Sequence, residues 1–360
     1  MAINSCTLSL SDYIPALKYR HTPESTRQTS VLPLPVELME QILHEAWCLP
    51  LHRDERVHMW VSLTTVSHTV LSIFIRISMC DVHIMTPAFS RRYLKLIRPR
   101  ASFEPDESYL VRNACHVAHR LCRSLTFHID SRPLAARFAD AEPAIRLYSD
   151  GDAAAEAVSS TLYVLSLVPV FVPHLRRVAL YYTDWGFDDV LDQCRLLPMP
   201  VQVRALELRY AFSPKLARLA DLSRIHYDRV PRPANMLWQM PQVRDLAVSG
   251  APSAFVTAVA KMCPLLERLE VDRYVELDRS WDVPKSLNTL VLEDGPSRVR
   301  EATDWWSVAR AVAGDAEATV TLYMQTMLST PWQDRLARQR LKRMCLRQYV
   351  TIEYARPTPR

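Results

Sequence analysis

A short apolar pattern that recurs along the C-terminal two thirds of the chain constrains the fold more than any other feature. In each copy one apolar residue is followed by a second three residues later and a third five residues later, and copies recur every 19 to 28 residues. Alternating apolar residues of this kind predict one short strand per copy. The six clear copies are Leu175/Val178/Leu180, Val203/Leu206/Leu208, Leu222/Ile225/Tyr227, Val243/Leu246/Val248, Leu266/Leu269/Val271 and Leu287/Leu290/Leu292. A weaker copy, Cys122/Leu125/Phe127, precedes them, and Val320/Leu322 follows.

The segments between the copies predict helices, for example over Ser253–Cys263 and Asp304–Ala313. Prolines stand just before several predicted strands, at Pro173, Pro241, Pro264 and Pro284. One strand and one helix per roughly 20–30 residues is the period of a leucine-rich-repeat solenoid, an α/β fold with a parallel sheet. The usual asparagine of that repeat is missing, so the pattern predicts an irregular, leucine-rich-repeat-like solenoid over residues 122–354. An ordinary α/β domain with coincidental apolar runs is the alternative.

Glycine is scarce, with five residues among 360, whereas there are 25 prolines. The two closest glycines are 19 residues apart, so neither a glycine-rich phosphate loop nor the two glycines of a nucleophile elbow can be formed. These absences argue against nucleotide-loop enzymes and esterase-type hydrolases, and we expect no enzymatic activity. Turns in such a chain must rely on proline and on buried loop side chains.

The charge and cysteine content favour an intracellular protein that binds neither nucleic acid nor a metal. Lys and Arg number 44 against 39 Asp and Glu, a net charge of +5 that is too small to predict nucleic-acid binding. Eight scattered cysteines without a CxxC pair indicate a reducing compartment, and no secretory signal is seen, so we expect a cytoplasmic or nuclear protein. Cys115, His119 and Cys122 share a helix face but lack a fourth ligand, so neither a metal nor another cofactor is expected. The apolar stretches Val57–Ile75 and Ala157–Pro173 are interpreted as buried helices, with no membrane association.

The N-terminal third has a different organisation. Residues 1–30 end in a polar run and predict a flexible leader. Apolar residues between Val36 and Trp47 form one wide helix face, and Pro35 precedes the first helical residue, where its missing N–H is not needed. A second helix is predicted over Val57–Ile75. Residues 31–80 thus form a small helical domain, residues 81–121 a connection with a strand at Asp81–Thr86 and a helix at Pro87–Ile97, and residues 355–360 a tail.

This helical segment carries the residues of a known motif. Leu34-Pro35-Val36-Glu37-Leu38, then Ile42-Leu43, then Leu63 and Val66-Ser67-His68 resemble the F-box. With Ile73–Arg76 and Asp81–Ile84, the segment is similar to F-box-like proteins of mushroom-forming fungi, in which degenerate leucine-rich repeats follow the motif. Val70 stands where the F-box usually has tryptophan.

The resemblance implies a substrate-recognition adaptor of an SCF-type cullin–RING ubiquitin ligase. The F-box would dock on the Skp-type subunit, and the repeats would hold the protein to be ubiquitinated. The docking residues that the resemblance implies are Leu34, Pro35, Leu38, Ile42, Leu43, Val66 and Phe74. A purely structural role in the helical core is the alternative for each of them. At the level of function, the alternative is a repeat-based interaction scaffold without ligase docking, which Val70 favours.

Contacts with the unknown substrate protein are expected on the predicted sheet. Residues that alternate with the buried apolar ones point away from the core, and the concave sheet of a solenoid is its usual binding surface. The candidates are Arg177, Tyr181, Glu207, Arg209, His226, Asp228, Arg268, Glu270 and Asp272. A merely solvated strand face is the alternative.

Overall fold

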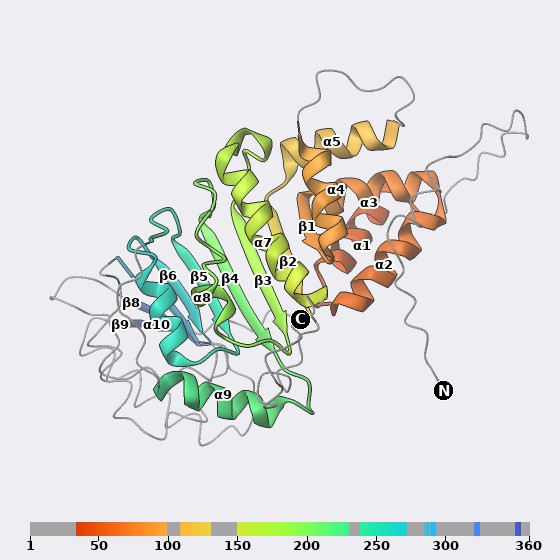
Figure 1. Ribbon diagram of the computed structural model, residues 1–360. Helices are drawn as coiled ribbons and strands as arrows, with labels where there is room; N and C mark the ends of the chain where they lie inside the picture. The colour runs from red at the N-terminus through yellow and green to blue at the C-terminus, as the bar shows by residue number, and fades with distance from the viewer. Residues whose placement is uncertain are drawn as a thin grey trace, which may run out of the picture. The chain divides into compact units, whose positions relative to one another are not determined.

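The structure is a computed structural model and has a mixed α/β fold. It describes residues 34–98, 109–130, 150–229, 238–271, 284, 286–287, 289–292, 320–324 and 350–353. The chain divides into two compact units (Figure 1). The first comprises Met1–Arg123 with Val170–His174, and the second comprises Ser124–Pro169 with Leu175–Arg360. We call them the helical unit and the sheet unit.

The helical unit is built around one buried helix. Its elements in chain order are α1 (Val36–Cys48), α2 (Arg53–Val66), α3 (His68–Cys80), β1 (Asp81–Ile84), α4 (Pro87–Ile97) and α5 (Tyr109–Leu121). Helices α1, α2 and α5 all contact α3. Aromatic rings fill the space between them, because Phe74 of α3 lies 5.1 Å from Trp47 of α1 and 5.2 Å from Trp60 of α2. The predicted helical domain therefore has its own apolar core.

The prediction of one continuous helix over Val57–Ile75 is wrong. The chain breaks at Ser67, whose extended backbone separates α2 from α3. The Ser67 hydroxyl accepts a hydrogen bond from the Val70 backbone N–H at 3.2 Å, which is the usual way a serine begins a helix. Two helices rather than one result from this cap.

Arg56 joins the end of α1 to α2. The buried Arg56 guanidinium donates to the Trp47 carbonyl at 2.7 Å and to the Leu49 carbonyl at 2.8 Å, and it lies 4.8 Å from the centre of the Trp47 ring. Carbonyl groups at a helix C-terminus lack partners within the helix, so this side chain supplies hydrogen bonds that the end of α1 needs.

We expect Arg56→Met to lower the free energy of unfolding by about 2 kcal/mol, because a buried carbonyl and a partly buried one lose a charged donor. Thermal unfolding followed by circular dichroism measures the change. Arg76→Met is the matched control, because Arg76 pairs with Glu40 on the surface and its loss should matter by less than about 1 kcal/mol. Equal effects of the two substitutions would contradict the prediction.

Eight parallel strands follow one another in the sheet unit in the order of the sequence. They are β2 (Ser124–Ile129), β3 (Arg177–Thr183), β4 (Ala205–Ala211), β5 (Asp245–Ser249), β6 (Arg268–Val271), β7 (Thr289–Leu292), β8 (Val320–Met324) and β9 (Val350–Glu353). The predicted parallel sheet is therefore confirmed. Strand β9 was not predicted.

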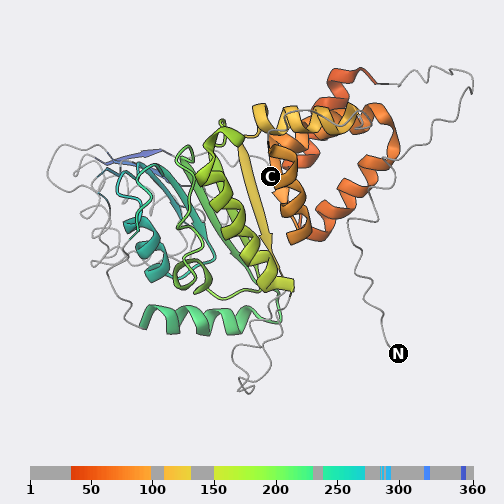
Figure 2. The same cartoon turned by 45° about the horizontal axis from the view of Figure 1, so that its top comes forward.

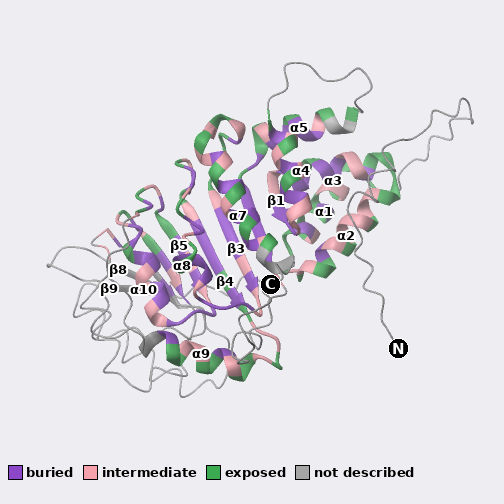
Figure 3. Ribbon diagram, viewed as in Figure 1, coloured by how far each residue is buried: buried purple, intermediate pink, exposed green. Residues whose placement is uncertain are grey.

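Helices cover the apolar face of this sheet. They are α7 (Asp150–Leu167), α8 (Asp189–Asp192) and α10 (Ser253–Lys261), and the 3-10 turn η2 (Pro169–Phe171) follows α7. Figure 2 shows α7 running along β2 and β3. Beneath the helices the Tyr182 and Tyr210 rings stack at 4.8 Å, and Phe255 of α10 packs edge-on against Tyr210 at 5.5 Å. Figure 3 shows the resulting burial of β3 and β4.

A buried ion pair holds the segment after β3. The Asp189 carboxylate accepts hydrogen bonds from the Tyr182 hydroxyl at 2.9 Å and from Arg195 Nη2 at 3.1 Å. Arg195 also donates to Glu156 of α7 at 2.7 Å. Burial acts to lower the pKa of Arg195, but Asp189 and Glu156 outweigh it and hold that pKa above its ordinary value.

One copy of the apolar pattern is not a strand. Leu222/Ile225/Tyr227 lies on helix α9 (Ala217–Arg229), whereas the other five clear copies and both weaker ones coincide with strands. Helix α9 is anchored by Arg224, which donates to the Gly250 carbonyl at 3.0 and 3.1 Å and lies 5.2 Å from the Phe212 ring.

The first apolar residue of several copies closes a turn before its strand. The backbone N–H of Val243 bonds to the Met240 carbonyl at 3.1 Å, and that of Leu266 bonds to the Cys263 carbonyl at 3.0 Å. Pro241 and Pro264 occupy the second position of these turns, which suits their fixed φ. The expectation that prolines form these turns is confirmed there.

At the opposite ends of the strands the backbone turns through the left-handed region. Gly250 follows β5 with φ +75°, and Asp184 follows β3 with φ 55°. Asp184 ties its turn to the segment after β4, because its carboxylate accepts a hydrogen bond from the Ser213 N–H at 2.7 Å. One of the rare glycines is therefore used at a turn after all, contrary to the expectation that turns avoid glycine.

Candidate functional site

The F-box-like residues of the helical unit divide into an exposed and a buried group. Leu34, Pro35, Leu38, Ile42 and Val66 are exposed, whereas Leu43 and Phe74 are buried. Phe74 has no exposed surface and packs between Trp47 and Trp60. The expectation that Leu43 and Phe74 form part of a docking surface is therefore wrong, because both belong to the core.

Helix α1 thus has two apolar faces. Leu43 and Trp47 point into the core, whereas Leu38 and Ile42, which are one turn apart, are 48% and 55% exposed. Val36 and Leu49 at the two ends of the helix are also exposed. An apolar face left in water costs free energy that contact with a partner would recover. We call Leu34, Val36, Leu38, Ile42 and Leu49 the α1 surface.

Four of the candidate substrate-binding residues form one network on the polar face of β3 and β4. Arg177 Nη2 contacts Glu207 Oε2 at 2.5 Å and the Tyr181 hydroxyl at 3.2 Å. The same hydroxyl donates to Glu207 Oε1 at 3.2 Å. Arg209 pairs with Glu207, and its guanidinium lies 5.0 Å from the centre of the Tyr181 ring. Strand register explains the arrangement, because Tyr181 lies directly opposite Arg209.

Ionisation in this network follows from the two arginines. Burial acts to raise the pKa of Glu207, but Arg177 and Arg209 outweigh it, so that the pKa lies below its ordinary value. Burial and the negative charge of Glu207 raise the pKa of Tyr181. Glu207 is therefore a carboxylate and Tyr181 a neutral hydroxyl, and the network offers both charged and neutral polar groups to a partner.

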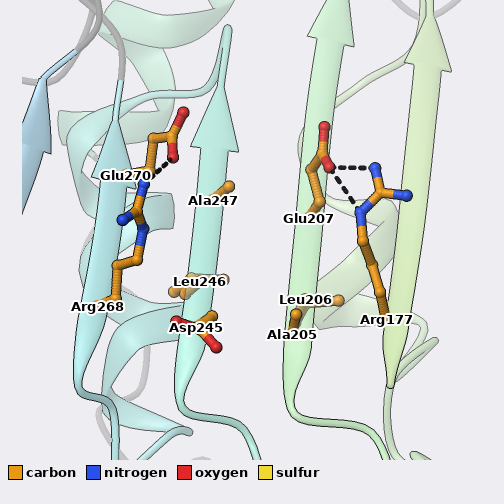
Figure 4. A pocket seen from close by; sticks show the side chains of 9 residues that line it. All are labelled: Arg177, Ala205, Leu206, Glu207, Asp245, Leu246, Ala247, Arg268 and Glu270. Atoms are coloured by element: carbon orange, nitrogen blue, oxygen red, sulfur yellow. Dashed lines mark hydrogen bonds and ion pairs between the residues drawn. The ribbon is translucent and has the colours of Figure 1, made fainter. Parts of the chain in front are cut away.

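A hollow of ≈ 120 Å³ lies beside the network, over β4 and β5 (Figure 4). Ala205 and Ala247 leave the space, because small side chains occupy positions where longer ones would fill it. Arg268 and Glu270, which were both candidates, pair with each other at 3.2 Å on its far side. Asp245 also lines the hollow, and burial raises the pKa of its carboxyl group. The predicted polar stripe missed the two alanines, although their small size at alternating positions was the available signal.

Two of the remaining candidates do not join this surface. His226 and Asp228 lie on α9 rather than on a strand, so their assignment to the sheet face is wrong. Asp272 lies outside the described residues.

Within the described ranges, no group of three His, Cys, Asp or Glu side chains could hold a metal ion. Across the same residues, no helix combines the length and apolar character needed to span a membrane.

Comparison with known proteins adds no relative. No family model, curated protein or solved structure matches the chain. The two surfaces must therefore be interpreted from their own chemistry.

Proposed function

We propose that this protein is a non-enzymatic substrate-recognition adaptor of an SCF-type cullin–RING ubiquitin ligase. The α1 surface docks on the Skp-type subunit, and the polar sheet face around Arg177, Tyr181, Glu207 and Arg209 binds a target protein. The sheet unit is then a leucine-rich-repeat-like solenoid, and the protein works in the cytoplasm or nucleus. Neither a cofactor nor a membrane nor a nucleic acid takes part.

The exposure of Leu38 and Ile42 carries this proposal. Both belong to the F-box-like motif, and both present apolar side chains to solvent on a helix whose other face is already packed. A monomer gains nothing from two such residues, whereas a partner helix can bury them.

The proposed mechanism needs no catalytic side chain. Holding a target next to a charged ubiquitin carrier raises the effective concentration of its lysines, and that alone accelerates transfer. The adaptor contributes position rather than chemistry.

Co-purification of the full-length chain with a Skp-type adaptor at micromolar concentration tests the docking. We expect Leu38→Asp and Ile42→Asp each to weaken binding by about 100-fold or more, because a carboxylate would be buried in an apolar contact. Leu222→Asp is the matched control, since Leu222 is 61% exposed on α9 of the other unit and should leave binding unchanged.

Two results would contradict the proposal. One is no binding of the adaptor by the folded wild-type chain, which would favour an interaction scaffold without ligase docking. The other is binding that neither Leu38→Asp nor Ile42→Asp weakens.

A further inference from the structure

Three arginines occupy the same position on three neighbouring strands. Arg176, Arg204 and Arg244 each stand one residue before the first residue of β3, β4 and β5. The strand register pairs Arg177 with Ala205 and Ala205 with Asp245, so the preceding arginines are also in line. Ala205 and Asp245 are labelled near the beginning of their strands in Figure 4.

Backbone hydrogen bonds fix this alignment. The Arg204 N–H donates to the Arg176 carbonyl at 2.8 Å, and the Arg244 N–H donates to the Arg204 carbonyl at 2.8 Å. Adjacent strands lie about 4.8 Å apart, so the three positions form a row across the sheet with that spacing. We call Arg176, Arg204 and Arg244 the arginine row.

The row is poorly neutralised. All three side chains are exposed, and only Arg244 pairs with a carboxylate of the described residues, that of Glu267 at the same position before β6. Within the described ranges, the three positive charges of the row are thus paired with one carboxylate. Like charges directly opposite one another destabilise a sheet, so the row lowers the stability of the folded chain unless a partner neutralises it.

Apolar residues stand next to the row. Val201 and Leu265 lie in the turns before β4 and β6 and are 68% and 49% exposed, and Pro241 is exposed in the turn before β5. The N-terminal ends of these strands therefore present a row of positive charges beside exposed apolar side chains.

We propose that this surface at the N-terminal ends of the strands binds an acidic amphipathic helix of a partner protein. Side chains three or four residues apart on a helix are about 5–6 Å apart, which matches the spacing of the arginine row, and the apolar stripe of such a helix would cover Val201 and Leu265. Single-stranded nucleic acid fits less well, because its sites combine positive charge with a series of aromatic side chains. In the seven described residues before each of β4, β5 and β6, Trp238 alone is aromatic. The inference does not rest on the proposed ligase role.

Fluorescence anisotropy with a defined probe tests the docking. The probe is a labelled helical peptide with glutamates at i, i+4 and i+7 beside a leucine stripe, and the full-length protein is titrated into it. We expect Arg176→Gln/Arg204→Gln to weaken binding about tenfold, equivalent to about 1.4 kcal/mol. A higher salt concentration should also weaken binding of the probe to the wild-type protein.

The controls separate this docking from general attraction to a basic protein. Lys215→Gln/Arg218→Gln removes the same charge from exposed residues near and on α9 and should leave affinity unchanged. Val201→Ser/Leu265→Ser should weaken binding without altering its salt dependence. Equal losses from both charge-removing variants, equal affinity for a probe with glutamine in place of glutamate, or tighter binding of a single-stranded oligonucleotide than of the probe would overturn the proposal.

Discussion

Asp189→Ala is expected to lower the free energy of unfolding of the sheet unit by about 3–5 kcal/mol. The substitution leaves Arg195 without its buried partner and the Tyr182 hydroxyl without its acceptor. Removing one member of a buried ion pair is costly because the other charge stays in a medium that solvates it poorly. Urea unfolding followed by circular dichroism, with hydrogen exchange of β3 and β4 amides, measures the loss in this unit.

The two carboxylates that bind Arg195 provide an internal comparison. The Glu156 side chain is 62% exposed, so Glu156→Ala should change stability by less than about 1 kcal/mol although it removes a contact to the same guanidinium. Replacing both buried charges by apolar residues, in Asp189→Leu/Arg195→Met, should be less damaging than Asp189→Ala alone. If the double variant were the less stable one, burial of an unpaired charge would not be the cause.

Gly250→Ala is expected to cost about 3 kcal/mol or more. A left-handed residue with a side chain costs about 1 kcal/mol by itself. The added Cβ would also stand 2.0 Å from the Tyr210 carbonyl oxygen, closer than any real contact, so the backbone of β4 or β5 must shift. That shift would disturb the Tyr182–Tyr210 stack and the hydrogen bonds from Arg224 to the Gly250 carbonyl.

The neighbouring Ser249→Ala places alanine at a position outside the left-handed region and removes only a hydroxyl group. We expect it to change the free energy of unfolding by less than about 0.5 kcal/mol. Chemical denaturation of both variants against wild type gives the comparison. A Gly250→Ala protein as stable as Ser249→Ala would show that the close approach to Tyr210 relaxes without cost.

The strands were predictable from sequence because apolar residues that pack under the helices alternate with residues of the opposite face. Val178 and Leu180 are buried beneath helices while Arg177 and Tyr181 face the other side, and the same alternation recurs on β4. The polar network could be predicted in part for the same reason, since parallel in-register strands bring alternate residues of neighbouring copies side by side. The pairing of each arginine with its carboxylate could not be predicted, because it depends on side-chain conformation.

Helix α9 shows where pattern reasoning fails. Its buried residues are Ala220 and Tyr227, with Arg224 turned toward the ends of the strands, whereas Leu222 and Ile225 are exposed. Two of the three apolar residues that matched the strand pattern, Leu222 and Ile225, therefore face water. The residues that anchor the helix include the charged Arg224. Hydrophobic spacing alone does not reveal an arginine that packs on aromatic rings.

In the helical unit the predictions failed for a different reason. Ser67 has the ordinary chemistry of a helix start, yet the apolar residues on both sides of it favoured one long helix. Phe74 belongs to the F-box-like segment. A sequence motif does not distinguish residues that bind a partner from residues that hold the helices together.

The strict chain order of β2 to β9 has a consequence for how such a protein can change. Each strand bonds only to the strands before and after it in sequence, so no connection has to cross another. Duplicating or deleting one strand together with its connection would lengthen or shorten the sheet without rethreading the rest. New binding surface can thus be acquired by local gene duplication, while the remaining strands keep their packing neighbours.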